Sequence, residues 1–325
     1  MVFAVRVEKT GDPSVLTLVD VDLPDPGHGE VRIRHTAIGL NFIDTYFRSG
    51  LYPAPNGVPF IPGNEGAGIV VALGQGVTGL ALGDRVAYAG PLGAYSEERN
   101  IPASVLVKIP EGVSDEQAAA LMLKGMTARY LLRETYNVGA DTTLLYHAAA
   151  GGVGLIVGQW ASALGARVIG TVSSEEKARL AQTNGYEYVI NYKSEDWVAR
   201  VRQITDGRGC DVVYDSVGKD TYPASLDCLR PRGLWCSFGQ SSGPLPEFNM
   251  AILSQKGSLF ATRPTLFNYI AERWELEETA GDLFAAVADG TINIQINQRY
   301  SLKDIAQAHC DLEGRKTTGA TVIIP

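Results

Sequence analysis

Leu144-Leu145-Tyr146-His147-Ala148-Ala149-Ala150-Gly151-Gly152-Val153-Gly154 is an apolar strand that enters a glycine-rich turn, and the chain continues from it as a helix to Leu164. The spacing of Ile156, Val157 and Trp160 predicts one buried stripe on that helix. Glycines let backbone amides approach phosphate oxygens, and the helix directs its positive N-terminal end at the same charge. The stretch therefore predicts a seat for the pyrophosphate of a nucleotide in an α/β fold.

The alternative is an ordinary tight turn between a strand and a helix in some other α/β protein. With 36 glycines in 325 residues, short glycine patterns also arise by chance. Two features of context favour the nucleotide site. One is the order of strand, turn and helix, and the other is Gly165, which is placed to end the helix in a left-handed conformation.

Length and composition predict a globular protein of two domains. The chain has 325 residues, of which 45% are hydrophobic, so each domain can fill a core. No apolar run approaches the roughly 20 residues of a membrane helix, and residues 1–7 alternate like a strand rather than a signal peptide, so we expect the cytoplasm. A net charge of -8 without runs of Lys or Arg argues against nucleic acid as a partner.

The cysteines predict no metal site and no disulfide framework. Cys210, Cys228, Cys236 and Cys310 all lie in the second half of the chain at wide spacing. This is neither a C-x-x-C zinc signature nor the dense pattern of a small secreted domain. We expect buried free thiols.

Short alternating runs separated by Gly and Pro fill residues 1 to about 110 and predict a barrel-like β domain. The expected strands are Phe3 to Glu8, Val31 to His35, Gly68 to Leu73, Arg85 to Ala89 and Val105 to Ile109. One short helix, at about Asn41 to Arg48, interrupts them.

A capping box at Ser114-Asp115-Glu116-Gln117 opens a long run of Ala, Leu and Met and marks the boundary between domains. Strands and helices alternate beyond it, which implies a parallel sheet wound on both faces. The expected strands are Thr142 to His147, Arg167 to Val172, Tyr188 to Asn191, Cys210 to Asp215, Gly233 to Gly239 and Ser258 to Thr262. A helix is expected after each of the first four, two of them starting at Ser174 and Ser194.

The last part of the chain predicts a helix from about Leu266 to Asp289 and a final strand at Ala320 to Ile324. Because no helix follows that strand, we expect it to return to the first domain. We then expect a cleft between the two domains, in which a ligand would be covered on both sides.

Several motifs together resemble one family across essentially the whole chain, although each alone is weak. They are Ala148 to Gly154, Gly63-Asn64-Glu65-Gly66-Ala67-Gly68, Gly83-Asp84-Arg85-Val86, Asn41-Phe42-Ile43-Asp44, Tyr214-Asp215-Ser216-Val217-Gly218, Ser237 to Gly243 and Thr262-Arg263-Pro264. By these motifs the chain resembles the medium-chain dehydrogenase/reductase superfamily. More narrowly, it is similar to the zinc-independent, zeta-crystallin-like NADPH:quinone oxidoreductases.

The resemblance implies an α/β fold, with a Rossmann doubly wound parallel sheet plus a GroES-like β-barrel domain. It divides the chain into a GroES-like catalytic domain at 1–123, a Rossmann dinucleotide-binding domain at 124–263, and a C-terminal segment at 264–325 that returns to the catalytic domain. It also implies a homodimer through the last Rossmann strand, whose apolar edge would otherwise be exposed. The alternative is that the chain's own loops cover this edge.

Many alcohol dehydrogenases of this superfamily hold a catalytic zinc with an early Cys, a His in a Gly-His-Glu motif and a later Cys. Here Asn41 lies in the region of the first Cys, Asn64 replaces the His, and no Cys precedes Cys210. Tetrahedral zinc needs thiolate or imidazole ligands, so we expect no metal. The scattered histidines are expected to be structural: His28, His35, His147 and His309.

The end of the second Rossmann strand favours NADPH. Proteins that prefer NAD usually place Asp or Glu there, about 20 residues past the turn, whereas this strand ends in Val172-Ser173-Ser174. No carboxylate repels a 2′-phosphate, and Lys177 and Tyr192 are placed to bind it. The alternatives are that a serine only caps the next helix, that Lys177 faces solvent, and that Glu175 or Glu176 binds the ribose.

The other expected cofactor contacts come from the turn and from the resemblance. They are Ala149, Gly151, Gly152, Val153, Gly154, Ser216, Val217, Phe238, Gly239, Ser241, Ser242, Arg263 and Arg315. By the resemblance, Arg315 is expected to join Ser173, Lys177 and Tyr192 at the 2′-phosphate. The alternative is that Arg315 is an ordinary surface residue.

Hydride transfer to an activated acceptor needs little acid-base machinery, because the cofactor supplies the reducing power and the protein mainly positions both rings. Asn41, by resemblance, and Thr127 are expected beside the nicotinamide, and Tyr46 and Tyr52 beside a planar acceptor. Tyr46 either donates a hydrogen bond to a quinone oxygen or only packs its helix. We expect Asp44 to be a charge at a helix N-terminus, not a general acid.

These observations favour NADPH-dependent reduction of quinones without metal. The first alternative is an NADPH-dependent reductase of an activated C=C bond in an enone, an alkenal or an enoyl thioester. The second is a non-enzymatic binding or structural role. The acidic balance and the intact nucleotide turn argue against that second alternative.

Overall fold

The structure, a computed structural model, describes residues 2–325 and divides into two compact units. Unit 1 comprises the segment up to Met126, Glu272–Ala288 and Ile294–Pro325, and unit 2 comprises Thr127–Ala271 and Asp289–Asn293. Each unit has its own main sheet and its own hydrophobic core. No helix of the described chain is both long and apolar enough to cross a membrane.

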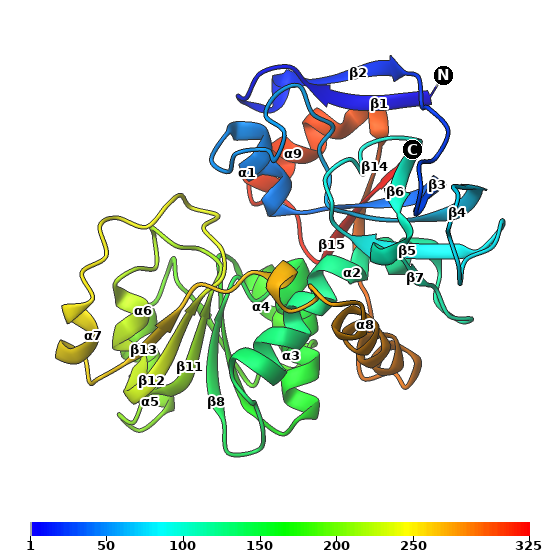
Figure 1. Ribbon diagram of the computed structural model, residues 1–325. Helices are drawn as coiled ribbons and strands as arrows, with labels where there is room; N and C mark the ends of the chain where they lie inside the picture. The colour runs from blue at the N-terminus through cyan, green and yellow to red at the C-terminus, as the bar shows by residue number, and fades with distance from the viewer. Residues whose placement is uncertain (1) are drawn as a thin grey trace. The chain divides into compact units, whose positions relative to one another are not determined.

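Unit 2 is built on a six-stranded parallel sheet with the strand order β10-β9-β8-β11-β12-β13. Its strands are β8 (Thr143–His147), β9 (Arg167–Val172), β10 (Tyr188–Asn191), β11 (Cys210–Asp215), β12 (Leu229–Ser237) and β13 (Phe260–Thr262). Its helices are α3 (Gly152–Ala163), α4 (Glu175–Gln182), α5 (Trp197–Ile204), α6 (Ala224–Asp227) and α7 (Ala251–Gln255). Helices lie on both sides of this sheet (Figure 1), so the predicted doubly wound arrangement is confirmed.

The central strands of this sheet are buried because helices cover both of its faces. Every residue of β8 and of β11 is buried, as expected for a parallel sheet between two layers of helices. The strand order reverses between these two strands, which pair with each other. Their carboxyl ends therefore form a topological switch point, where doubly wound sheets bind ligands.

Helix α3 follows β8 as the sequence predicts. It begins after Gly151 and buries Ile156, Val157 and Trp160. Gly165 lies just beyond its end with a φ of 82°, which confirms the predicted left-handed position.

Unit 1 contains a seven-stranded sheet with the order β14-β15-β3-β4-β5-β7, in which β6 pairs with β3, and a two-stranded sheet of β1 and β2. The strands are β1 (Val2–Val7), β2 (Leu16–Val21), β3 (Glu30–Leu40), β4 (Glu65–Leu73), β5 (Arg85–Ala89), β6 (Glu98–Pro102), β7 (Val107–Lys108), β14 (Ile296–Ser301) and β15 (Ala320–Ile324). Two register shifts between β3 and β4 bend the sheet around its core. The final strand β15 pairs antiparallel with β3.

Helices α1 (Phe42–Ser49), α8 (Arg273–Ala288) and α9 (Ile305–Glu313) belong to unit 1, and α2 (Asp115–Tyr130) runs from unit 1 into unit 2. The capping box that opens α2 is confirmed. The Ser114 N–H donates to the Gln117 side chain at 2.9 Å, and the Gln117 N–H donates to the Ser114 hydroxyl at 3.2 Å.

The predicted helix from Leu266 to Asp289 is wrong in its first part. Leu266–Asn268 form a 3-10 turn, and α8 begins only at Arg273. Tertiary contact overrides helix propensity here, because the Tyr269 ring stacks on Tyr130 with the centroids 4.4 Å apart. The N–H of Glu272 then bonds to the Glu275 carboxylate at 2.9 Å, which starts the helix.

Other differences are smaller. The helix expected from Ser194 begins at Trp197, because the Asp196 carboxylate caps it through the N–H groups of Val198 and Ala199. The helix between β11 and β12 is only α6, and β12 begins earlier than predicted, at Leu229. Strands β2, β6 and β14 and helix α9 were not predicted. Three cysteines are buried and free, as predicted, but Cys310 is exposed.

Two helical glycines should respond in opposite ways to replacement by alanine. A Cβ on Gly158 in α3 would lie 2.3 Å from the Asn184 carbonyl oxygen, whereas a Cβ on Gly281 in α8 would meet nothing within 4 Å. We expect Gly158→Ala to lower the free energy of unfolding by at least about 1 kcal/mol through overpacking. Gly281→Ala should raise it by about 0.5–1 kcal/mol through helix propensity. Urea unfolding of both variants measures this, and an equal sign for the two would contradict the packing of α3.

Candidate active site

The turn after β8 presents backbone amides where the sequence predicts a pyrophosphate. Ala148 is left-handed, with a φ of 63°, and α3 begins directly after Gly151. A Cβ on Gly154 would lie 2.6 Å from the carbonyl oxygens of Ala148 and Ala149, so glycine is required there. Leu155 donates the first helical bond to the Gly151 carbonyl, so the amides of Gly152, Val153 and Gly154 precede the ladder of α3. The N–H groups of Ala149 and Gly151 donate to the carbonyls of Thr171 and Ala148 and hold the turn. This end of α3 has the geometry of an anion site.

A buried carboxylate, Asp215, organises the loop that follows β11. It accepts N–H bonds from Val217 at 2.9 Å and Gly218 at 3.1 Å, and O–H bonds from Thr221 and Ser225. Burial raises the pKa of Asp215, but His147 and these donors outweigh burial and hold the pKa below its usual range. The carboxylate therefore stays charged and fixes the loop.

The loops after β11 and β12 also bond to each other, and they carry several predicted cofactor contacts. The N–H groups of Ser241 and Ser242 donate to the carbonyls of Ser216 and Val217 at 3.1 and 2.9 Å. The Ser242 hydroxyl donates to the Val217 carbonyl at 2.8 Å, so this side chain joins the two loops. Arg263 supports the second loop from β13, because its guanidinium donates to the carbonyls of Ser237 and Gly239.

Phe238 and Thr127 are two further predicted contacts in unit 2. The Phe238 ring lies 5.9 Å from the buried Tyr146 ring beneath the loops. Thr127 lies on α2 with 7% of its surface exposed. Phe238 and Thr127 therefore have restricted side chains before any ligand binds.

The structure separates the two serines at the end of β9. The Ser174 hydroxyl caps α4 by accepting the Lys177 N–H at 3.3 Å. Ser173 is half-buried and is not the cap. The alternative that Ser173 serves only as a helix cap is therefore excluded.

Glu175 has a partner that holds it at the start of α4. Its carboxylate accepts the Asn191 side chain at 3.2 Å. The next residue, Tyr192, donates its N–H to the Val172 carbonyl at 3.1 Å, which brings the end of β10 beside the end of β9. Ser173 and Tyr192 thus follow the carboxyl ends of neighbouring strands, and Lys177 lies in the first turn of α4. Their binding of a 2′-phosphate stays a prediction.

In unit 1, the Asn41 carboxamide is oriented by a buried ion pair. Its Nδ2 donates to Glu65 Oε2 at 2.8 Å, and Lys124 Nζ donates to the same oxygen at 2.8 Å. The second Glu65 oxygen accepts the Leu123 N–H at 2.7 Å. Glu65 is fully buried and Lys124 nearly so. With its amino group engaged, Asn41 has a fixed orientation.

A second buried carboxylate, Asp44, lies in the first turn of α1. It accepts the Asn41 N–H at 2.9 Å, the Asn64 side chain at 2.8 Å and the Tyr95 hydroxyl at 2.9 Å. Burial raises the pKa of Asp44 to about 6, against the opposing effect of these donors. Its predicted place at a helix N-terminus is confirmed, but the sequence did not predict its complete burial.

Tyr46 and Tyr52 lie close together, as the prediction of an acceptor site requires. Their rings pack edge to face with the centroids 5.2 Å apart, and the Tyr52 N–H donates to the Tyr46 carbonyl at 3.0 Å. Tyr46 is buried in α1, and Tyr52 is half-buried.

Three histidines are structural, as predicted. His35 bonds to the Ser96 carbonyl and the Tyr88 hydroxyl, and His147 bonds to Thr171 and Ser225. His309 bonds to the Tyr95 hydroxyl at 3.0 Å. Burial lowers the pKa of all three imidazoles, so they are neutral near pH 7.

The positions compared above with zinc ligands hold amides that already have partners. The amino group of Asn41 donates to Glu65 and that of Asn64 to Asp44. Within residues 2–325 there is no cluster of three or more His, Cys, Asp or Glu side chains that suits a metal ion.

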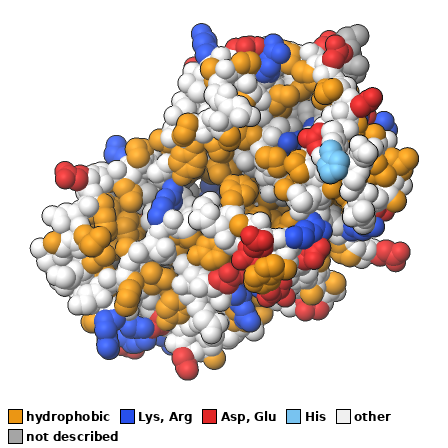
Figure 2. Space-filling model, in the orientation of Figure 1, with side chains coloured by type: hydrophobic (Ala, Val, Ile, Leu, Met, Phe, Trp, Pro, Cys, Tyr) orange, Lys and Arg blue, Asp and Glu red, His pale blue; other side chains and the backbone are white. Residues whose placement is uncertain are grey.

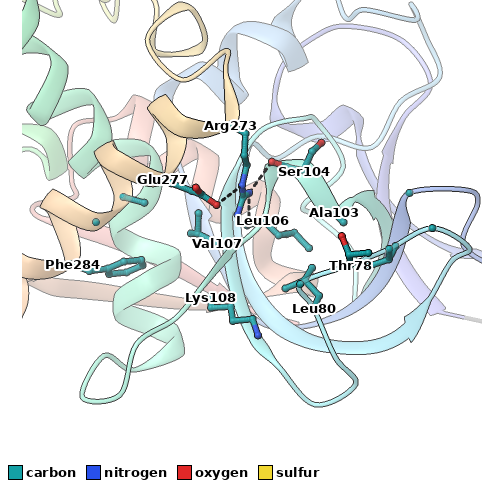
Figure 3. Close-up of a pocket in the computed structure, with 16 residues that line it drawn as sticks. Thr78, Leu80, Ala103, Ser104, Leu106, Val107, Lys108, Arg273, Glu277 and Phe284 are labelled. Carbon is teal, nitrogen blue, oxygen red and sulfur yellow. Dashed lines mark hydrogen bonds and ion pairs between the residues drawn. The ribbon is translucent and has the colours of Figure 1, made fainter.

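A groove of about 690 Å³ lies elsewhere in unit 1, between the turn at 76–80, β7 and α8 (Figure 3). Its charged groups already have partners. Arg273 donates to the carbonyls of Ser104 and Leu106 and to Glu277, and Lys108 pairs with Asp84. None of the predicted site residues lines this groove. Arg273 fastens the start of α8 to the turn that precedes β7, and the groove does not coincide with the predicted site.

The predicted residues thus fall into two groups, one in each unit. Unit 2 brings together the glycine turn, the two loops and the edge at Ser173. Unit 1 brings together Asn41, Tyr46 and Tyr52, while Arg315 is exposed beyond α9. Sequence reasoning did not identify Glu65, Lys124, Tyr95 or His309 as parts of the network around Asn41. A signal was available for Glu65, because a carboxylate that opens an apolar strand is costly to bury without partners.

Basic side chains show no single binding surface on the face of the molecule in Figure 2. Lys and Arg lie there scattered among acidic and uncharged side chains. Nucleic acids are bound by clustered positive charge, so this face offers no support for such a partner.

The raised pKa of Asp44 has a consequence for stability. The folded pKa of about 6 lies above the ordinary value of 3.8, so the folded protein holds this proton over a pH range where the unfolded chain has lost it. The associated stability is present below the unfolded pKa and is lost as the pH rises through 6. Between about pH 4.5 and about pH 7.5, wild type should lose about 2 kcal/mol relative to Asp44→Asn, measured by urea unfolding.

Asp84→Asn is the matched control for this experiment. The hydrogen bond from Lys108 lowers the pKa of Asp84, so its contribution should stay nearly constant over the same range. A constant difference between wild type and Asp44→Asn would show that the Asp44 carboxyl titrates normally.

Comparison with known proteins agrees with this geometry. Two family models match: alcohol dehydrogenase GroES-like domain over residues 27–111, and zinc-binding dehydrogenase over residues 152–280. The quinone oxidoreductase of Pseudomonas aeruginosa is 56% identical over 316 residues, which cover 97% of each chain. The 2-haloacrylate reductase of a Burkholderia species is 46% identical over 100% of this chain and 99% of the relative.

A solved structure, Escherichia coli quinone oxidoreductase complexed with NADPH, is 50% identical and has a TM-score of 0.97, over 99% of this chain and 100% of that chain. These matches confirm the predicted fold, a Rossmann domain with a GroES-like domain. The chain belongs to the quinone oxidoreductases of the medium-chain dehydrogenase/reductase superfamily.

Proposed function

We propose that this protein reduces quinones with NADPH, by hydride or electron transfer and without a metal. The observation that carries the proposal is the glycine-rich turn that leads from the carboxyl end of β8 into α3, together with Ser173 at the position where a carboxylate would repel a 2′-phosphate. Two relatives support it by name, since one is a quinone oxidoreductase and another is a quinone oxidoreductase complexed with NADPH.

The residues of unit 2 fit such a dinucleotide. Glycine at 154 keeps the turn tight, and a Cβ on Gly239 would lie 2.6 Å from the Ser216 carbonyl oxygen. We assign the pyrophosphate to Ala149, Gly151, Gly152, Val153 and Gly154, and the 2′-phosphate to Ser173, Lys177 and Tyr192. The loops at Ser216–Val217 and Phe238–Ser242, supported by Arg263, would hold the nicotinamide half together with Thr127. Arg315 is assigned to the adenosine end.

The residues of unit 1 act by position. When bound, NADPH supplies the hydride, and the chain needs to place the acceptor and keep water away. Glu65 fixes the Asn41 amide, which we assign to the nicotinamide side of the acceptor site. The rings of Tyr46 and Tyr52 offer a planar acceptor aromatic edges, and the Tyr46 hydroxyl is assigned as a hydrogen-bond donor to its oxygen.

Reduction of an activated C=C bond is a second candidate, because the 46% identical relative is a 2-haloacrylate reductase. A conjugated acid or enone resembles a quinone in presenting an electron-poor C=C bond that is conjugated with a carbonyl group. The two functions differ in the acceptor alone, so one assay separates them.

The proposal extends to assembly and location. Strand β13 is the edge of its sheet, and the Phe260 side chain on it is 63% exposed. An exposed apolar edge is suited to pairing with a second copy, and we propose a homodimer through this strand.

We also propose that the protein is located in the cytoplasm, where the free thiols of Cys210, Cys228 and Cys236 would persist in reducing conditions.

Oxidation of NADPH by the purified protein tests the function directly. We expect a higher kcat/KM with a simple benzoquinone than with 2-chloroacrylate or an enone, measured side by side at 340 nm. The opposite order would favour the C=C reductase.

Tyr46→Phe keeps the ring and removes one donor, so we expect less than about a tenfold loss of kcat with quinone. Complete loss in a folded Tyr46→Phe protein would contradict a mechanism based on positioning.

Ser173→Asp tests the phosphate pocket. The introduced carboxylate should repel the 2′-phosphate and bind ribose hydroxyls instead. We expect kcat/KM for NADPH to fall by at least about tenfold, which corresponds to about 1.4 kcal/mol, while kcat/KM for NADH stays equal or rises. Ser254→Asp, the same change at an exposed serine of α7, is the control and should alter neither value. Equal effects of Ser173→Asp on the two cofactors would contradict the assignment.

A further inference from the structure

A continuous chain of polar contacts crosses unit 1 and ends at the asparagines of the candidate site. We call it the Asp44 chain, and its members are Glu313, Arg48, His309, Tyr95, Asp44 and Asn64. Arg48 binds Glu313 in a two-pronged ion pair with N···O distances of 2.9 and 2.7 Å. Beyond it, Nδ1 of His309 lies 3.5 Å from the Arg48 guanidinium, and Nε2 of His309 lies 3.0 Å from the Tyr95 hydroxyl.

The Arg48 end fixes the direction of every bond in the Asp44 chain. A guanidinium can only donate, and its charge disfavours a proton on the ring nitrogen that faces it, so the proton of the neutral His309 lies on Nε2. The Nε2–H group then donates to the Tyr95 oxygen. Since that hydroxyl has one proton, it donates to Asp44, 2.9 Å away.

This direction keeps Asp44 an acceptor. The Asn41 N–H, the Asn64 amino group and the Tyr95 hydroxyl all point donors at Asp44. A protonated Asp44 would have to donate to the Tyr95 oxygen or to the Asn64 carbonyl oxygen, and so would reverse one of these bonds, because the Asn41 N–H can only donate. With Asp44 ionised, the Asn64 amino group turns toward the carboxylate, and its carbonyl oxygen turns away. The same carboxylate holds the Asn41 N–H and so the start of α1.

The Asp44 chain grips α1 at both ends. Asp44 and Arg48 are four residues apart and therefore lie on one face of the helix, where both are buried. Tyr46, two residues from each, lies on a different face. Fixing Asp44 and Arg48 therefore sets the position of Tyr46 and of Asn41, which precedes the helix.

Asp44 has no direct cationic partner among the described residues that surround it. Lys124 donates to Glu65 instead, and Arg48 donates to Glu313. The other titratable groups facing Asp44 are Tyr95 and, further away, Tyr88 and His309. The ionised form of Asp44 thus depends mainly on neutral donors, with a smaller contribution from the charge of Lys124. Among these donors, Tyr95 is the one linked to His309.

We propose that Tyr95 and His309 are positioning residues for quinone reduction, which act through Asp44 to fix Asn41, Asn64 and helix α1. Arg48, held by Glu313, sets the direction of the hydrogen bonds between them. The role of these residues in quinone reduction rests on the proposed function. The direction of the hydrogen bonds does not depend on it. The two parts can be tested separately.

The nitrogen-15 shifts of His309 test the direction without any cofactor. We expect the wild type to show a protonated Nε2 and an unprotonated Nδ1 near pH 7, with the signals assigned by comparison with His309→Gln. In Arg48→Met the Nδ1 tautomer should become populated, because the charge facing it is removed. A protonated Nδ1 in the wild type, or an unchanged tautomer in a folded Arg48→Met protein, would overturn the proposal.

The pH profile of kcat/KM tests the link to the reaction. Asp44, with a pKa of about 6, must be charged, so activity with quinone should fall as the pH decreases below that value. Tyr95→Phe removes a donor to the charged form, and its acid limb should move to higher pH by at least about half a unit.

Tyr88→Phe is the matched control, because it removes the hydroxyl of another buried Tyr–His pair, 2.7 Å from His35, without touching Asp44. Its acid limb should coincide with that of the wild type. An active Tyr95→Phe enzyme with an unmoved limb, or an equal shift in Tyr88→Phe, would overturn the inference. A wild type with the expected tautomer but no quinone reduction would overturn the proposed function instead.

Discussion

The need to satisfy buried carboxylates with hydrogen bonds governs both halves of the candidate site. A carboxylate removed from water costs several kcal/mol unless donors replace its hydration. In unit 2, Asp215 collects the amides of the next loop and so shapes the switch point of the sheet. In unit 1, Asp44 and Glu65 collect Asn41 and Asn64. The residues that donate to these three carboxylates are largely the residues proposed to contact the ligand, or their neighbours in sequence. Folding of each unit therefore also assembles its part of the candidate site.

The elements that could be predicted are those whose structure is determined by their own local sequence. The bounds of β9, β10, β11 and β15 follow from apolar runs that end at turn residues. Strand β14 has no such pattern, because its residues alternate only between half-buried and exposed, and it exists by pairing with β15. The predicted helix at 266–289 fails for the same reason, since the contact of Tyr269 with Tyr130 is invisible in the local sequence.

The site divides in the same way. The glycine turn is a local feature, and its geometry could be predicted from eleven consecutive residues. The Asp44 chain is not local, because Asp44 and Tyr95 are 51 residues apart and Tyr95 and His309 are 214 residues apart. The sequence could indicate that His309 is structural and that Asp44 belongs to a helix start. Only the fold brings both side chains to the Tyr95 hydroxyl, which accepts from His309 and donates to Asp44.

The amides at 41 and 64 also connect structure with substrate class. At positions 41 and 64, which the sequence comparison with zinc-dependent dehydrogenases singled out, this chain carries carboxamides whose amino groups are directed at Glu65 and Asp44. A carboxamide held in this way orients a partner but does not withdraw electrons from it as a Lewis acid does. The acceptor must therefore bring its own electron deficiency. Quinones and conjugated acids are electron-poor in this way, and simple ketones are not. Glu65 and Asp44, which hold the two amides, therefore suit the candidate site to activated acceptors.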